Sequence, residues 1–316
     1  MEEKKIIAAI DLGSHNCRLS IAEVKEGNAS IIYSNSKITK IGENLSYRGE
    51  FSDESMRLNL DYIKFIQQKL NQFRVNDYRF VATEAFRKSI NSKLLVDLVK
   101  KETNLNIEII SKKEEARLCL ISCKEHNISK ENYGLVFDIG GGSTEIIIVK
   151  NKIFDKIETG DFISIPYGVV NIDQEFNIFS IQKVMNKIDR MLGLFKNNLD
   201  IKYFKMDAIG CCTTITSICA IERNIKTYVR HKVNGAILEE NSIKKTINYY
   251  CSLTPEMKKK HPVIKNQNVK LLNNGIIILK KIMQYFPFEN ILVSDNGLRS
   301  GIIREFIENP YEKNQN

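Results

Sequence analysis

Two short glycine-containing turns carry the residue types that phosphate chemistry requires. The first turn is Asp11-Leu12-Gly13-Ser14, and the second is Asp138-Ile139-Gly140-Gly141-Gly142-Ser143. Glycine lets backbone N–H groups approach phosphate oxygens closely, and serine hydroxyls add further donors. An aspartate at the end of a strand can hold Mg²⁺, directly or through water. Each turn therefore has the composition of a phosphate site with a metal-binding carboxylate.

Both turns join one predicted strand to another. Apolar runs at 6–10 and 135–137 precede them, and further runs at 17–24 and 145–149 follow. A P-loop and a dinucleotide-binding fingerprint both open a helix, so neither describes these turns. One copy would indicate only an ordinary hairpin. Two copies at equivalent places favour phosphate binding, and two such halves facing each other across a cleft is the plan of the actin-like phosphotransfer fold.

Predicted strands alternate with predicted helices along the 316 residues, which indicates α/β architecture. The polar segment 127–132 is the best candidate for a linker. We therefore expect one domain over 1–128 and a second over 129–297, with a C-terminal helix at about 298–316 packing back on the first. The strands are expected at 5–10, 17–24, 30–34, 78–82, 107–110 (short and buried), 134–139, 144–150, 152–158, 204–209 and 290–293. The helices are expected at 53–73, 92–103, 113–126, 180–198, 214–222, 241–251, 269–285 and 298–307.

Composition limits the classes of function. The formal net charge of +9 permits a polyanionic ligand, but the basic residues form no concentrated block and no nucleic-acid recognition motif occurs. The seven cysteines form no CxxC pair and have no histidine at zinc-like spacing, so we expect small buried side chains in a reducing compartment. No run approaches membrane-spanning length and the N-terminus has no secretory signature, which predicts a cytoplasmic location and no membrane partner.

Five longer segments make the resemblance to a known family specific. They are VATEAFRKSIN at 81–91, IEIISKKEEARL at 107–118, FDIGGGSTEIIIV at 137–149, SIPYGVV at 164–170 and VSDNGLRSGII at 293–303. In this order and spacing, the chain resembles the exopolyphosphatase/guanosine pentaphosphate phosphatase (Ppx/GppA) family over nearly its whole length. The resemblance implies two actin-like (ribonuclease H-like, ASKHA) domains. It also implies Mg²⁺-dependent release of terminal phosphate from polyphosphate, guanosine pentaphosphate or both. The partners it implies are polyphosphate or guanosine penta- or tetraphosphate, and it suggests a homodimer.

Glu115 is the predicted general base. Residues Ser111 to Glu114 have the pattern of a capping box, in which Glu114 reaches back to the N-cap and so has a structural role. Glu115 has no such role and matches the catalytic glutamate of the family, where it could deprotonate the attacking water. The alternative is a solvated glutamate favoured by the helix dipole.

The resemblance assigns the remaining site residues. Asp11 and Asp138 match metal- or water-holding positions, and Glu145 matches a further acidic position, with an exposed strand glutamate as the alternative. Arg87 matches a phosphate-binding arginine, with a surface pair to Glu84 as the alternative. The predicted phosphate-binding residues are Gly13, Ser14, Arg18, Arg87, Gly140, Gly141, Gly142 and Ser143.

Three departures from the family pattern leave a second function open. The first turn continues as His15-Asn16, Thr213 replaces a glycine whose turn would favour positive φ, and Asn268-Val269-Lys270 replaces an Arg-Ala-Asp-type motif. The two later changes favour a low-turnover regulatory protein that binds an alarmone or polyphosphate, whereas the retained Glu115, Asp138 and 140–143 oppose it. A kinase or ATPase of the same fold is a third reading that rests on fold analogy alone. Asp295 and Gly297 are expected to have structural roles near a hinge.

Overall fold

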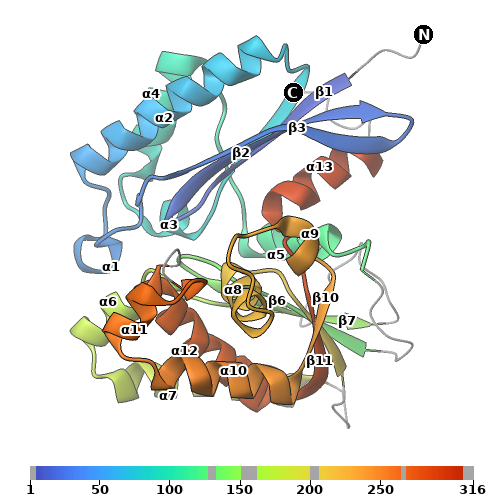
Figure 1. The fold of residues 1–316 in the computed structure, drawn as a ribbon. Coiled ribbons are helices and arrows are strands. Elements are labelled where there is room, and N and C mark those ends of the chain that lie inside the picture. Colours follow the sequence, from blue (N-terminus) through green and yellow to red (C-terminus); the bar gives the residue numbers. More distant parts are fainter. Residues whose placement is uncertain (1–4, 127–132, 151–161, 200–205, 265–267, 309–316) are drawn as a thin grey trace. The chain divides into compact units, whose positions relative to one another are not determined.

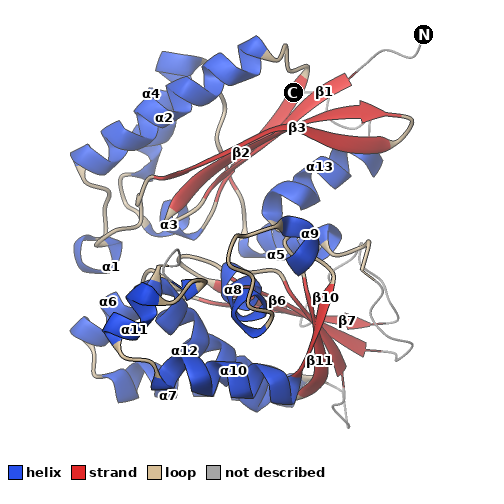
Figure 2. Ribbon diagram, viewed as in Figure 1, coloured by secondary structure: helices blue, strands red, loops and turns tan. Residues whose placement is uncertain are grey.

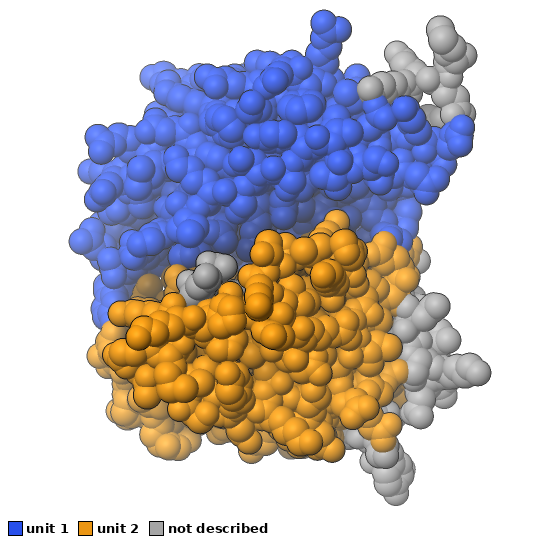
Figure 3. Space-filling view, viewed as in Figure 1, with its two compact units in different colours: residues 1–122, 298–316 blue, residues 123–297 orange. Residues whose placement is uncertain are grey.

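The chain forms two compact units, which Figure 3 distinguishes by colour. Unit 1 comprises Met1–Ser122 and Leu298–Asn316, and unit 2 comprises Cys123–Gly297. The computed structural model describes residues 5–126, 133–150, 162–199, 206–264 and 268–308. The predicted linker at 127–132, the predicted boundary at 128 and the predicted strand at 152–158 lie outside the described residues.

Strands and helices alternate in both units (Figures 1 and 2). Unit 1 contains β1 (Lys5–Leu12), β2 (Asn16–Lys25), β3 (Asn28–Ile38), α1 (Leu45–Arg48), α2 (Asp53–Gln72), β4 (Asp77–Ala82), α3 (Glu84–Lys88), α4 (Ser92–Thr103), β5 (Glu108–Ile109), α5 (Lys112–Ser122) and α13 (Leu298–Glu308). Unit 2 contains β6 (Tyr133–Ile139), β7 (Thr144–Lys150), β8 (Phe162–Ile165), α6 (Ile172–Ile178), α7 (Ile181–Asn198), β9 (Met206–Gly210), α8 (Thr213–Glu222), α9 (Arg230–Val233), β10 (Ala236–Glu239), α10 (Glu240–Ser252), α11 (Pro255–Lys260), α12 (Val269–Tyr285) and β11 (Phe288–Val293).

The two sheets repeat one topology. The sheet of unit 1 has the order β3-β2-β1-β4-β5, and that of unit 2 has the order β8-β7-β6-β9-β11 with β10 added at the edge. In unit 1, β3, β2 and β1 pair antiparallel in succession, and β4 and β5 run parallel to β1. In unit 2, β8, β7 and β6 pair antiparallel in succession, and β9 and β11 run parallel to β6. The predicted α/β class and the duplicated actin-like plan are therefore confirmed.

In unit 1 the central strand β1 buries both of its faces. Ala8, Ile10 and Leu12 pack in the cluster with residues of α2 and α4. Ile7 and Ala9 pack on the opposite face with residues of α5 and α13. This explains why the run 6–10 is continuously apolar rather than alternating, as expected of a strand covered on both sides. The C-terminal helix α13 thus completes the core of the unit that the N-terminus begins.

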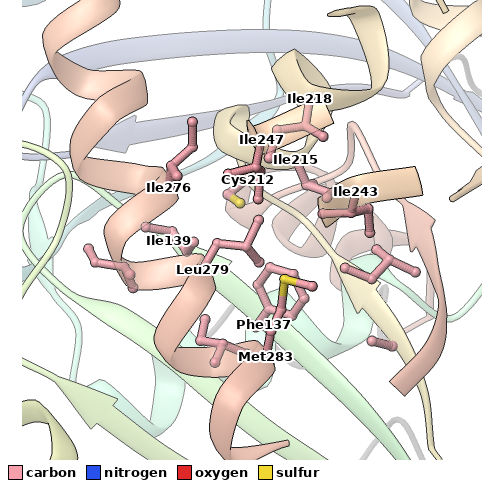
Figure 4. Packing of buried hydrophobic residues seen from close by; sticks show 14 of the residues in the cluster. Phe137, Ile139, Cys212, Ile215, Ile218, Ile243, Ile247, Ile276, Leu279 and Met283 are labelled. Carbon is pink, nitrogen blue, oxygen red and sulfur yellow. The ribbon is translucent and has the colours of Figure 1, made fainter. Parts of the chain in front are cut away.

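In unit 2 a larger core lies on one face of the sheet. Leu135, Phe137 and Ile139 of β6 point into it, because alternate residues of a strand share a face. Figure 4 shows Phe137 and Ile139 meeting side chains of α8, α10 and α12, among them Ile215, Ile247 and Leu279. Asp138 has the opposite parity, so it lies on the face of the sheet away from this core.

Most predicted elements occur within a few residues of their expected bounds, with instructive exceptions. The strand predicted at 107–110 is only Glu108–Ile109, and both of its residues are exposed rather than buried. The helix predicted to reach His126 ends at Ser122, one residue before unit 2 begins. Short elements with weak periodicity were not predicted: α1, α3, α6, α9, α11, β8 and β10.

The cysteines are mostly small core side chains, as predicted. Six are buried, whereas Cys251 is exposed, so the prediction is wrong for that residue. The Sγ atoms of Cys123 and Cys211 lie 3.1 Å apart within unit 2.

Among the described residues, no group of three or more His, Cys, Asp or Glu side chains could hold a metal ion. None of the helices in the described part of the chain has the length and apolar character that crossing a membrane requires.

Close packing of α13 on α5 gives a stability prediction. A Cβ at Gly301 would lie 2.1 Å from the carbonyl oxygen of Leu118, whereas a Cβ at Gly297 would meet nothing within 4 Å. We expect Gly301→Ala to destabilise the protein by about 1–3 kcal/mol, because backbone cannot give way as a flexible side chain can. Gly297→Ala is the control and should change the free energy of unfolding by less than about 0.5 kcal/mol. Urea denaturation of both variants tests this, and equal stabilities would contradict it.

Candidate functional site

The residues predicted to bind ligand in unit 1 follow three neighbouring strands. Parallel pairing aligns Leu12 of β1 with Ala82 of β4, and Ala82 with Ile109 of β5. The carboxyl ends of the three strands therefore meet at one edge of the sheet, where ligands bind in open α/β sheets. The first glycine turn follows β1, Arg87 follows β4 and Glu115 follows β5.

The two glycine turns have the same construction. Gly13 N donates to Asn16 O at 3.0 Å, and Gly140 N donates to Ser143 O at 2.9 Å. Each aspartate is the penultimate residue of its strand and lies opposite the residue seven positions later: Asp11 opposite Arg18, Asp138 opposite Glu145. The repeat recognised in the sequence is therefore also a repeat of register and hydrogen bonding.

A segment later in the chain supports each turn by hydrogen bonds to the carbonyl oxygens of the turn. Gly42 N donates to Ser14 O at 2.8 Å, and a Cβ at Gly42 would lie 2.8 Å from Ser14 Cβ. At the second turn, the N–H groups of Val169 and Val170 donate to Gly140 O and Gly141 O at 2.9 and 2.8 Å. A Cβ at Gly168 would lie 2.4 Å from Gly140 O. Both supporting glycines are needed for close backbone approach, and sequence reasoning did not single out either one.

Asn171 adds a side-chain clamp behind the second turn. Its amide nitrogen donates to Gly142 O at 2.9 Å and to Pro166 O at 3.1 Å, and its amide oxygen accepts from Gly168 N at 2.7 Å. These bonds occupy the carbonyl side of the turn. Among the described residues, no hydrogen bond uses the N–H groups of Gly141, Gly142 and Ser143. Successive N–H groups of this kind suit an anion.

Asp138 and Glu145 form a cross-strand carboxylate pair in unit 2. Directly opposite residues of antiparallel strands have their side chains on the same face, about 5 Å apart at Cβ. Glu145 is 2% exposed and accepts a hydrogen bond from Ser164 Oγ at 2.8 Å, so the alternative of an exposed strand glutamate is wrong. Mg²⁺ in phosphate sites takes one or two carboxylates plus phosphate oxygens, which this pair beside the glycine turn fits.

Asp11, the third predicted metal position, lies in unit 1 and is buried. Burial raises the pKa of its carboxyl group, and the charges of Arg18 and Arg299 oppose that shift in part. Arg18 Nη1 lies 3.8 Å from Asp11 Oδ2. The predicted phosphate-binding Arg18 is thus the cross-strand partner of the predicted metal-binding aspartate.

Glu115 and Arg87 are brought together in unit 1. Arg87 Nη2 donates to Glu115 Oε2 at 2.7 Å and to Glu84 Oε2 at 2.8 Å, with the three side chains 14%, 16% and 4% exposed for Glu115, Arg87 and Glu84. Burial opposes the charge of Arg87, but Glu115 and Glu84 outweigh it and raise the pKa of the guanidinium. The pair with Glu84 exists but is not a surface pair, and Glu115 is not a solvated side chain.

Glu114 has a structural role, although not the predicted one. Glu114 N donates to Ser111 Oγ at 3.1 Å, which is half of a capping box. Its carboxylate turns instead to Arg117 and Arg79, at 2.7 Å each. Both arginines also bind Glu305 of α13. The reciprocal half of the predicted capping box is therefore wrong, because two guanidinium groups are better partners for a carboxylate than one N–H group.

The three departures occupy defined positions. Asn16 Oδ1 at the first turn is buried with no hydrogen-bond partner in the structure. Thr213 is the first residue of α8, and it is not among the residues with positive φ, so the expected backbone conflict does not arise. Asn268 accepts from Leu271 N as the N-cap of α12, and Lys270 pairs with Asp173. Gly297 is the last residue of unit 2, and Asp295 lies 3.4 Å from Arg230.

Comparison with known proteins identifies the family. The model of the Ppx/GppA phosphatase family matches residues 20–309. The chain belongs to this family. The predicted enzyme class, a hydrolase acting on phosphoric anhydrides, is confirmed with it.

Relatives and solved structures agree with this membership. A Fusobacterium nucleatum protein named bifunctional 3-dehydroquinate synthase/phosphatase is 29% identical over 96% of this chain, which spans 46% of that protein's length. A Photobacterium profundum guanosine-5'-triphosphate,3'-diphosphate pyrophosphatase is 27% identical over 45% of this chain and 29% of its own length. The crystal structure of the Aquifex aeolicus Ppx/GppA family member is 27% identical and covers 98% of this chain and 100% of its own, with a TM-score of 0.80. A Cytophaga hutchinsonii exopolyphosphatase structure, 20% identical with a TM-score of 0.83 over 96% of this chain and 98% of its own, shares the fold.

The ion pairs of Glu114 predict a contribution to the free energy of unfolding that is lost at acid pH. Burial opposes its ionisation, but hydrogen bonds from Arg117 and Arg79 hold the pKa of the Glu114 carboxyl below its usual 4.5. A carboxyl with a lowered pKa stabilises the folded state above its unfolded pKa and loses that effect as the pH falls. We expect Glu114→Gln to cost about 1.5–3 kcal/mol at pH 7, and much less near pH 3. Unfolding midpoints of both proteins between pH 3 and 7 test this, and a difference independent of pH would contradict it.

Proposed function

We propose that this protein is a Mg²⁺-dependent phosphohydrolase that releases terminal phosphate from inorganic polyphosphate, guanosine pentaphosphate or both. The observation that carries the proposal is Glu115, partly buried, held at 2.7 Å by Arg87 and placed by β5 at the carboxyl edge of its sheet. The fold hosts several phosphotransfer chemistries, and a carboxylate base distinguishes transfer to water from mere binding.

Each of the proposed site residues has a separate role in the reaction. A water oxygen attacks the terminal phosphorus, Glu115 accepts a proton from that water, and the bond from phosphorus to the bridging oxygen breaks. In unit 2, the backbone N–H groups of residues 141–143 would bind phosphate oxygens, since no hydrogen bond within the described residues uses them. The ion pair with Arg87 favours the ionised form of Glu115, which is the form that a general base needs.

Asp138 and Glu145 would hold the Mg²⁺ ion in unit 2. Asp11 in unit 1 stays a predicted metal position. The ion would neutralise phosphate charge as the leaving group departs. Ser164 orients Glu145 by its hydrogen bond at 2.8 Å, which is the role of an outer-shell partner at metal sites.

A low-turnover binding protein is the second candidate. Asn268 and Lys270 serve a helix cap and an ion pair, which supports loss of a ligand contact at these positions. The preference between polyphosphate and guanosine pentaphosphate, a cytoplasmic location and a homodimer stay predictions.

Replacing Glu115 tests the assignment of the base. We expect Glu115→Gln to lower phosphate release from the preferred substrate by about a hundredfold or more, the scale of a lost general base. Release is measured with polyphosphate and guanosine pentaphosphate as separate substrates. Glu114→Gln is the matched control, since it removes the neighbouring carboxylate without touching Arg87, and its rate should stay within about threefold at 25 °C.

The outcomes separate the candidate functions. Release unaffected by Glu115→Gln would keep the hydrolase and remove Glu115 from its role. Tight binding of both substrates by the wild type without any release would identify the binding protein instead.

Metal removal tests the proposed Mg²⁺ site. We expect EDTA to abolish phosphate release and Mg²⁺ to restore it, and Asp138→Asn to raise the Mg²⁺ concentration for half-maximal rate by about tenfold or more. Asp189→Asn removes a carboxylate of unit 2 that pairs with Lys281, so it should leave that concentration unchanged. Full activity in EDTA would overturn the proposed metal dependence.

A further inference from the structure

Glu84 is a buried carboxylate that the proposed reaction does not use. Its side chain is 4% exposed, although ionised carboxylates are costly to remove from water. It is the first residue of the short helix α3, separated from the end of β4 by Thr83 alone. Its contacts are Arg87 Nε at 3.1 Å, Arg87 Nη2 at 2.8 Å and Lys88 Nζ at 3.4 Å.

Arg87 is nearly saturated by its present partners. It makes two bonds to Glu84, one to Glu115 and one from Nη1 to the carbonyl oxygen of Ile110 at 2.9 Å. These use four of the five N–H bonds of a guanidinium group. Of the donors, one N–H on Nη1 is left for a phosphate oxygen. The guanidinium is therefore positioned chiefly with respect to Glu115, and it is not available for bidentate binding of a ligand.

Helix α3, the segment after β5 and helix α5 together hold Glu84, Arg87 and Glu115 in place. Ile110 N donates to Ala82 O at 3.1 Å, which ties the segment after β5 to the end of β4. Glu84 and Arg87, three residues apart, share one face of α3. Glu115 N donates to Ser111 O, so the first turn of α5 fixes the backbone of the base. The series of ion pairs from Glu84 through Arg87 to Glu115 thus joins α3 to α5, two helices that the parallel strands place side by side.

We propose that Glu84 is a positioning residue, which fixes the Arg87 guanidinium and through it the carboxylate of the general base Glu115. This rests on the proposed hydrolase function. The logic is that of a base oriented by a third group. Without the negative charge of Glu84, Arg87 keeps its bonds to Glu115 and to Ile110 O but loses the charged partner of Nε and Nη2. The guanidinium, and with it the carboxylate of Glu115, is then less precisely oriented.

A double-mutant cycle separates positioning from a general structural role. Glu84→Gln keeps the size of the side chain and removes its charge. We expect it to lower kcat for phosphate release by about tenfold or more while KM changes less than about threefold. In the Glu115→Gln background, where no base remains to be positioned, the same change should alter the residual rate by less than about twofold, because residues that act as one unit are not additive. Glu84→Asp replaces Glu84→Gln in the cycle if the amide variant does not fold.

Glu108→Gln is the matched control. It also removes a carboxylate from an arginine of unit 1, Arg79, which pairs with Glu108, Glu114 and Glu305 and not with Glu115. Its kcat should remain within about twofold of wild type. Equal fold losses from Glu84→Gln in the two backgrounds would overturn the positioning role and leave the hydrolase intact. A wild type that releases no phosphate from either substrate would instead overturn the proposed function, and the positioning role with it.

Discussion

Parallel strand pairing places the candidate chemistry. In unit 1, β1, β4 and β5 run in one direction, so the first glycine turn, α3 and α5 all begin at one edge of the sheet. In unit 2, β6, β9 and β11 repeat the arrangement, and the second glycine turn, the Cys211–Thr213 turn and the segment after Val293 follow their ends. Residues more than seventy positions apart, such as Asp11 and Arg87, are thereby presented by one edge.

The glycine turns depend on support from outside their own sequence. A turn that offers its N–H groups to an anion must have its carbonyl groups satisfied elsewhere. Gly42 does this for the first turn, and residues 168–171 do it for the second. At Gly42 and Gly168 the approach is so close that a Cβ would lie less than 3 Å from the turn, so neither residue can carry one. The duplicated turn therefore comes with a duplicated, glycine-dependent support.

Charge in unit 1 is arranged in two separate arginine clusters. Arg79 and Arg117 join Glu114 of α5 to Glu305 of α13, which ties the C-terminal helix to the unit. Arg87 joins Glu84 to Glu115 at the carboxyl edge of the sheet. Adjacent glutamates in the sequence thus belong to different clusters, because neighbouring helix positions point about 100° apart. One cluster serves stability, and the other holds the proposed base.

Much of the architecture could be predicted from the sequence by itself. The apolar runs before Asp11 and Asp138, the repeated turn and the helical periodicities were sufficient for the α/β class, the duplication and most element bounds, because these depend on local patterns. The pairing of Arg87 with Glu115, the partners of Glu114 and the burial of Glu145 were decided only by the tertiary structure. They join residues from different elements, and no local pattern records which side chains meet when two strands align in parallel. Gly42, Gly168 and Asn171 escaped notice for the same reason: their role is a contact with a distant backbone, which a glycine or asparagine in a loop does not reveal.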